Sequence, residues 1–298
     1  MSTAKKQSMK VKLFSVEAAD EDTSLGDVLA IIDATTLEQR LRRLAGGHEI
    51  RIEKVVRPGE RKPYWLLDFV RLRFEHGPGR ASARTPLEGF ELAEGDGFGE
   101  ETAMLFDPKT GSLFMQYNHF GVKESAAEAY FSMFDDQRAY GFEFLPALDS
   151  SVEAKLASAS QFSKFTMKVA PAGINKDLRK SNVSLGRALD IADELRAPVV
   201  ELTVGVGHAR TGLPVPSVHD AVNFVKRMIR VSPDSVLRAG VVGKDMSNDD
   251  APSEFLDLIA PKKVWDFDNL ELGSDLRYTQ SSRFNALERA RLDWLRHR

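Results

Sequence analysis

The spacing of apolar residues changes near the middle of the chain, and this change constrains the fold more than any other feature. Before residue 150, apolar and charged residues alternate as in Val70-Arg71-Leu72-Arg73-Phe74, which is the period of a half-buried strand. After residue 151, extended stretches alternate with stretches of helical period. The pattern predicts an α+β protein, with a hairpin-rich N-terminal α+β domain over residues 1–150 and an α/β domain over residues 151–298.

Turn residues place the elements of the first domain. The segment Asp107-Pro108-Lys109-Thr110-Gly111 predicts a tight hairpin turn, because Pro presets φ and Gly accepts a left-handed conformation. Asp22 or Ser24 is suited to cap a helix that begins beside it. In chain order we predict a strand at 12–18, a helix at 24–34, a helical turn at 37–45, hairpins at 49–56/64–74 and 101–106/112–117, a helix at 123–134 and a strand at 140–145.

The second domain has β-α-β-α-β order followed by a C-terminal helix. Strands are expected at 163–169, 198–206 and 236–242, and helices at 185–195, 217–231 and 283–295. Val218, Val222, Val225 and Ile229 repeat at the helical period, so we expect them to be buried. This order is compatible with a split βαβ unit.

Composition sets the protein class. A hydrophobic content of 42% over 298 residues can fill a sizeable core, and the absence of cysteine excludes disulfides and thiolate metal sites. The first eleven residues are polar, and no apolar run approaches the length of a bilayer span. We therefore expect a cytoplasmic protein with no signal peptide and no membrane insertion.

Catalytic, metal and cofactor motifs are not evident in the sequence. Asp266 and Asp268 could offer carboxylates to a divalent cation, although an alternating strand with one wet face explains them as well. Glu153-Ala154-Lys155 is the nearest approach to a nuclease motif, but its two charges diverge on a helix. The segment 205–212 lacks the third glycine of a dinucleotide loop. We predict no catalytic residue, no metal site and no cofactor.

Basic residues give the strongest functional signal. The whole chain carries a net charge of −3, yet residues 151–298 hold 22 Lys and Arg against 19 Asp and Glu. Between Ser160 and Ser184, five basic residues stand against the single acid Asp177. Clustered cations bind the phosphates of nucleic acid without reading its bases. The DNA-binding candidates are Lys164, Lys168, Lys176, Arg179, Lys180, Lys226, Arg227 and Arg230.

The C-terminal helix carries an apolar stripe that requires a partner surface. Phe284, Leu287, Trp294 and Leu295 form this stripe. A terminal helix of this kind docks either on its own domain or on a second subunit. The sequence leaves both possibilities open.

The centre of the N-terminal half resembles a known group of proteins. The residues that carry the likeness are Gly97-Phe98-Gly99-Glu100-Glu101-Thr102-Ala103-Met104-Leu105-Phe106 and Leu113-Phe114-Met115-Gln116-Tyr117-Asn118. They resemble the RexA/KwaB-like phage-exclusion and anti-phage defence proteins. This resemblance implies an intracellular homodimer that binds DNA with little sequence preference and has no established enzymatic chemistry.

The resulting interpretation is a non-enzymatic DNA-binding or DNA-sensing component of a phage-defence or exclusion system. It would bind DNA nonspecifically through the basic C-terminal half, as a homodimer. Two alternatives remain open: a metal-dependent nuclease of a defence system, and a regulatory module whose partner is a protein encoded nearby.

Overall fold

The computed structural model describes residues 8–18, 23–134, 141–207, 211–244, 253–259 and 263–297. The chain forms two compact units. Unit 1 comprises Met1–Phe144 and Val264–Asp293, and unit 2 comprises Leu145–Lys263 and Trp294–Arg298. The mixture of antiparallel sheets and helices confirms the predicted α+β class.

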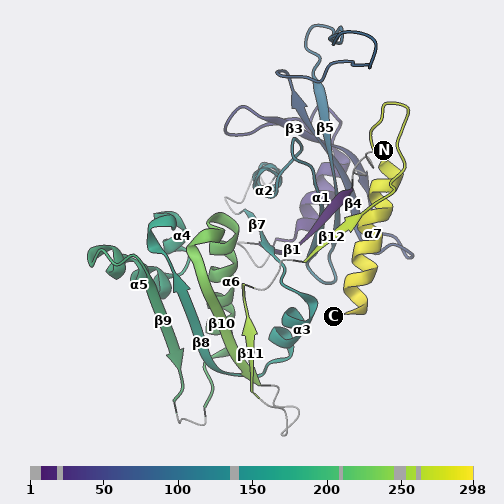
Figure 1. Cartoon of the computed structure of the whole chain (residues 1–298). Helices are drawn as coiled ribbons and strands as arrows, with labels where there is room; N and C mark the ends of the chain where they lie inside the picture. Colours follow the sequence, from purple (N-terminus) through teal and green to yellow (C-terminus); the bar gives the residue numbers. More distant parts are fainter. Residues whose placement is uncertain are drawn as a thin grey trace. The chain divides into compact units, whose positions relative to one another are not determined.

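Unit 1 is built on an antiparallel sheet that has eight strands within the described residues (Figure 1). Its main path runs β12-β1-β6-β5-β4-β3-β2, and β7 also pairs with β1. The predicted turn at Asp107–Gly111 joins β5 to β6 and is thereby confirmed. The strands are β1 (Met9–Ala18), β2 (Arg42–Arg43), β3 (Glu49–Val56), β4 (Trp65–Arg73), β5 (Phe98–Asp107), β6 (Ser112–Tyr117), β7 (Phe142–Pro146) and β12 (Val264–Phe267).

Two helices cover one face of this sheet, and a third covers the other. Helices α1 (Leu25–Ala34) and α2 (Glu124–Ser132) pack on a core that includes Leu67, Phe69 and Met104. Ser24 caps α1 as predicted, with a capping box completed by Asp27. Helix α7 (Gln280–Arg296) reaches Asp68 and Asp107, which alternate along their strands with core residues and so point to the opposite face.

The helical turn predicted at 37–45 is wrong in its second half, because Arg42–Arg43 forms β2 and pairs with β3. Arg40 explains the change of direction. Its buried guanidinium donates to the carbonyls of Ile32 and Thr35 at the end of α1, and to those of Asp33 and Ile52. The carbonyls left over at the helix end are thus bonded without a further helical turn.

The C-terminal part of the chain differs from the predicted division at residue 150. Residues 264–293 belong to unit 1, although we predicted a second domain that runs unbroken from 151 to 298. Strand β12 pairs with β1, and α7 is held to the same sheet by two ion pairs. These residues complete an edge and a face that the N-terminal segment leaves uncovered.

Unit 2 contains an antiparallel sheet with the order β11-β10-β8-β9. Strands β9 and β10 are each antiparallel to β8, which lies between them, so they run parallel to each other and α6 connects them. This confirms the predicted split βαβ unit. The elements are α3 (Ser150–Ser158), β8 (Gln161–Val169), α4 (Lys176–Lys180), α5 (Val183–Glu194), β9 (Val200–Gly205), α6 (Val215–Val231), β10 (Val236–Lys244) and β11 (Glu254–Asp257). Short 3₁₀ turns lie at Pro171–Gly173 and Pro233–Ser235.

The helices of unit 2 lie on one face of its sheet (Figure 1). Phe165, Met167 and Val169 of β8 point into the core that these helices form. On α6, Val218, Val222 and Val225 are buried as predicted, while Ile229 packs against the core from a partly buried position. Because side chains alternate along a strand, the residues between Phe165, Met167 and Val169 must point to the other face.

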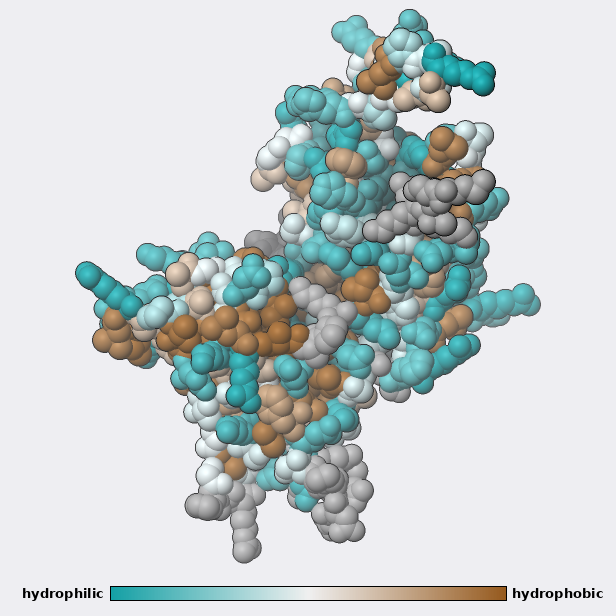
Figure 2. All heavy atoms as spheres, viewed as in Figure 1, coloured by the Kyte–Doolittle hydropathy of each residue, from teal (hydrophilic) through white to brown (hydrophobic). Residues whose placement is uncertain are grey.

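The long connection between β4 and β5, residues 74–97, is an exposed loop on unit 1 (Figure 2). Backbone hydrogen bonds between Arg80 and Glu88 close it into a ribbon. Phe90 is 53% exposed and packs edge-on against Phe98 at 6.1 Å between ring centroids. Apolar side chains thus stand among hydrophilic ones in this loop.

No helix in the described ranges has the length and apolar character needed to cross a bilayer.

Candidate nucleic-acid interface

The face of the unit 2 sheet that the described helices leave uncovered, here called the open face, gathers three basic residues from two strands. Strand pairing arranges the face in three rows. The first row contains Gly205, Lys164, Val242 and Phe255, and the second contains Thr203, Thr166, Gly240 and Asp257. The third contains Glu201, Lys168 and Arg238.

Contacts confirm that these side chains share a face. The hydroxyls of Thr166 and Thr203 lie 3.2 Å apart across β8 and β9. Lys168 Nζ lies 3.6 Å from a carboxylate oxygen of Glu201, and both side chains remain about half exposed. The guanidinium of Arg238 lies 5.6 Å from the centre of the Phe255 ring. The open face is therefore a polar surface with cations on β8 and β10 and an aromatic ring on β11.

Of the eight residues predicted to bind DNA, only Lys164 and Lys168 lie on the open face. Their shared side of the strand follows from the even spacing along β8, as the sequence predicted. Lys164 is exposed, and Lys168 is partly exposed beside Glu201. These two lysines are the part of the predicted set that the structure brings together.

Arg179 and Lys226 are buried and cannot serve as surface phosphate contacts, which corrects the prediction for both. Arg179 is 7% exposed and donates to the carbonyls of Ile174 and Pro171 and to two carboxylates. Lys226 is 6% exposed, and its ammonium lies 2.7 Å from Glu153. Both cations hold unit 2 together.

The remaining four candidates lie away from the open face. Lys176 and Lys180 are exposed at the two ends of α4, which is anchored on the helix side by buried Leu178. Arg227 and Arg230 are half-buried on α6, and Arg230 stands in the last turn, where a cation complements the helix dipole. These residues could extend a charged surface but do not form one row with Lys164 and Lys168.

Arg238 and Phe255 were missed by the sequence reasoning. Arg238 lies on β10 and Phe255 on the short β11, and the strand pairing that places them in the rows of Lys168 and Lys164 is not visible in the local sequence. Alternation with the buried Ala239 and Val241 places Arg238 on the open face, and the bulge at Leu237 returns Val236 to the covered face. A count that started at the buried Val236 and ignored the bulge would place Arg238 on the covered face.

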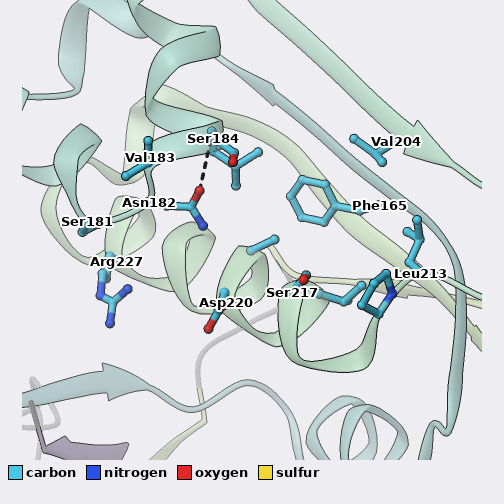
Figure 3. A pocket seen from close by; sticks show the side chains of 14 residues that line it. Phe165, Ser181, Asn182, Val183, Ser184, Val204, Leu213, Ser217, Asp220 and Arg227 are labelled. Atoms are coloured by element: carbon cyan, nitrogen blue, oxygen red, sulfur yellow. Dashed lines mark hydrogen bonds between the residues drawn. The ribbon is translucent and has the colours of Figure 1, made fainter. Parts of the chain in front are cut away.

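A cleft of 690 Å³ lies on the covered side of unit 2, between the start of α5 and the first half of α6 (Figure 3). Phe165 and Val204 line the cleft from the sheet, and Ser217, Asp220 and Arg227 line it from α6. Asn182 caps α5 there by accepting from the backbone N–H of Leu185 at 3.0 Å. The cleft is separated from Lys164 by the thickness of the sheet.

The residues considered for metal chemistry have other roles or stand apart. Glu153 accepts a hydrogen bond from Lys226, and Lys155 donates one to Glu254. The side chains of Glu153 and Lys155 therefore point to different partners. Asp266 and Asp268 are both exposed at β12. Across the described ranges, no group of three or more His, Asp or Glu side chains is placed to hold a metal ion. In segment 205–212, residues 208–210 lie outside the described residues.

Comparison with known proteins gives the chain a family. No curated protein matches it. The profile of DUF6731, described as a family of unknown function, matches residues 15–290, which covers nearly all of the chain and includes both units. The protein therefore belongs to the DUF6731 family.

Proposed function

We propose that the protein binds DNA without sequence preference through the open face of unit 2, as a non-enzymatic DNA-binding or DNA-sensing component of a phage-defence system. The observation that carries the binding proposal is the convergence of Lys164, Lys168 and Arg238 on one uncovered sheet face. The defence role rests on the resemblance of residues 97–118 to phage-exclusion proteins.

The charges of the open face favour moderate, salt-sensitive binding. Three cations stand against Glu201 and Asp257, so the face carries only a small positive excess. Phosphate contacts release counterions, and the logarithm of the affinity then falls linearly with the logarithm of the salt concentration. With about three contacts, the expected slope on duplex DNA is about −3.

Replacing Lys164 and Lys168 with Gln should weaken binding to every duplex alike and make the salt slope shallower by about one unit per lost contact. Fluorescence anisotropy with two duplexes of unrelated sequence measures both quantities. Glu201→Gln should have the opposite effect, because it frees Lys168 from the ion pair that now competes with phosphate.

The defence role has its own test in cells. Phage should form plaques less efficiently on cells that express the wild-type protein than on cells that express the Lys164→Gln/Lys168→Gln variant.

The matched control is Lys176→Gln/Lys180→Gln, which removes the same charge from exposed positions on α4. If this control weakens binding as much as the β8 pair does, net charge rather than the open face governs affinity. Binding that ignores salt would contradict the proposal altogether. Plating that is identical with and without the wild-type protein would remove the defence role and leave the binding result standing.

We also propose that the protein is a homodimer formed through β9. Helix α7, whose apolar stripe suggested a dimer, buries Leu287 and Trp294 of that stripe within the chain, while Leu295 is 37% exposed. Strand β9 lies at an edge of the sheet, and Glu201 is its single charged residue; Val204, on the other side of the strand, is 43% exposed. An edge strand with few protecting charges is able to pair with a second copy.

Light scattering should report about twice the chain mass of 33.2 kDa for the wild type and the monomer mass for Val204→Lys. A lysine on the edge strand places two like charges near each other in the paired form. Ile191→Lys, at an exposed position on α5, is the control. A monomeric wild-type protein at micromolar concentration would contradict the dimer.

A further inference from the structure

We infer that the open face prefers single-stranded nucleic acid, because Phe255 offers a stacking surface for one base beside the cations of β8 and β10. This inference rests on the proposed function and names its substrate class. Phosphate contacts alone attract duplex and single strands similarly. An exposed aromatic ring distinguishes them, since only a single strand can turn an unpaired base toward a protein surface.

The position of the Phe255 ring depends on Gly240. A Cβ atom added at Gly240 would lie 2.2 Å from Cζ and 2.5 Å from Cε2 of Phe255, so the ring extends over the glycine. Any larger residue at position 240 would displace the ring. Because Gly240 has no side chain, the Phe255 ring can pack directly against the backbone on the open face of the sheet.

The ring remains available for a ligand. Phe255 is 43% exposed although Leu256, its neighbour in sequence, is buried at 4% on the covered side. The Arg238 guanidinium lies over the ring at 5.6 Å from its centre, so a stacking base would displace it from the ring toward the adjoining phosphate. Base–aromatic stacking tolerates any sequence, because every base has a π face.

The geometry of the rows fits a short stretch of single strand. Phe255 and Lys164 share the first row, separated by β10, and Lys168 lies two rows farther along β8. At a rise of about 3.3 Å per residue, the two lysines are roughly 13 Å apart along their strand. A backbone that follows β8 can place phosphates on both lysines while one base reaches across β10 to the ring.

Charge complementarity favours nucleic acid over an apolar partner for this face. Around Phe255, the first and third rows present Lys164, Lys168 and Arg238, and the middle row presents the hydroxyls of Thr166 and Thr203. Glu201 and Asp257 lie on the same face, so the cations exceed the acids by one charge. A protein partner that buried the ring would also have to desolvate these cations, which costs free energy unless each is paired. A polyanion binds the same groups with their charges satisfied.

Phe255→Ala should reduce affinity for a fluorescein-labelled 15-nucleotide oligo-dT by about 5- to 100-fold, the loss expected for one stacked base. Affinity for a blunt duplex of the same length should change by less than about twofold. Phe255→Trp, which keeps an aromatic surface at this position, should retain binding. In Phe255→Trp, oligo-dT should also quench the fluorescence of the added indole, which a merely structural role of the ring would not produce.

The control is Phe90→Ala, which removes a similarly exposed phenylalanine from the loop of unit 1 and should leave both affinities unchanged. Circular dichroism checks that each variant is folded. If Phe255→Ala leaves oligo-dT affinity unchanged, or lowers duplex affinity equally, the inference is overturned. The effect of removing Lys164 and Lys168 tests the proposed function separately, so the failure of one can be told from the failure of the other.

Discussion

Arg283→Met should lower the free energy of unfolding of unit 1 by about 3–5 kcal/mol, the cost of leaving one member of a buried ion pair without its partner. Arg283 and Asp68 are each 4% exposed, and the guanidinium donates to both carboxylate oxygens at 2.5 and 2.8 Å. Gln280 donates to the same carboxylate at 2.7 Å. Methionine fills similar space but leaves the Asp68 charge buried between α7 and the sheet.

Urea unfolding followed by tryptophan fluorescence measures this effect, because Trp65 and Trp265 both lie in unit 1. The double variant Asp68→Leu/Arg283→Met should be less destabilised than Arg283→Met alone, since it removes the unpaired charge. Arg289→Met on the same helix is the control. It removes an exposed cation that stacks on Phe267 at 4.9 Å, so a loss below about 1 kcal/mol is expected. Equal losses for Arg283→Met and Arg289→Met would contradict the role of the buried pair.

Local patterns in the sequence predicted most elements of both units because the forces that define them act over a few residues. Ser24 with Asp27 marks the start of α1, and Pro108 with Gly111 fixes the turn between β5 and β6. The apolar stripe on α6 identified its buried face. In each case a cap, a turn conformation or a single period decides the structure before distant contacts form.

Pairings between distant segments were not predictable in this way. The return of residues 264–293 to unit 1 depends on the free edge of β1 and on Asp68, some 200 residues away in the chain. The residues of the candidate site were also hard to predict, because they lie on strands that are distant in the sequence. Lys164 and Lys168 share a face by simple alternation, but the pairing that sets Arg238 of β10 opposite Lys168 joins segments that lie far apart in the chain. A count of basic residues also cannot distinguish an exposed lysine from Lys226, which is buried against Glu153.

The sequence predicted that Arg179 binds DNA, whereas the structure buries it inside unit 2. Replacing Arg179 should show which of these two roles it has. The guanidinium of Arg179 donates to the carbonyls of Ile174 and Pro171 and to the carboxylates of Asp190 and Asp193. Its own carbonyl lies so near α5 that a Cβ on Gly186 would approach it to 2.1 Å. Arg179 thus ties the turn after β8, α4 and α5 into one packed cluster.

Arg179→Met should therefore destabilise unit 2 by about 2–4 kcal/mol, because two buried carbonyls lose their donor and two carboxylates lose the cation between them. Asp190 and Asp193 remain half exposed, so the carbonyls account for most of the cost. Hydrogen exchange of peptides from β8 and α5 in the full chain measures the change in unit 2 directly. Arg187→Met, at an exposed position on α5, is the control and should leave exchange unchanged.

DNA affinity gives the second readout for Arg179→Met. At a temperature where exchange shows unit 2 folded, the variant should bind duplex DNA as the wild type does, since the buried guanidinium contributes no phosphate contact. Binding should then fail only as unit 2 unfolds on warming. If the variant keeps wild-type exchange but loses DNA affinity and one unit of salt slope, Arg179 contacts phosphate after all. In that case the candidate interface would have to include α4 as well as the open face.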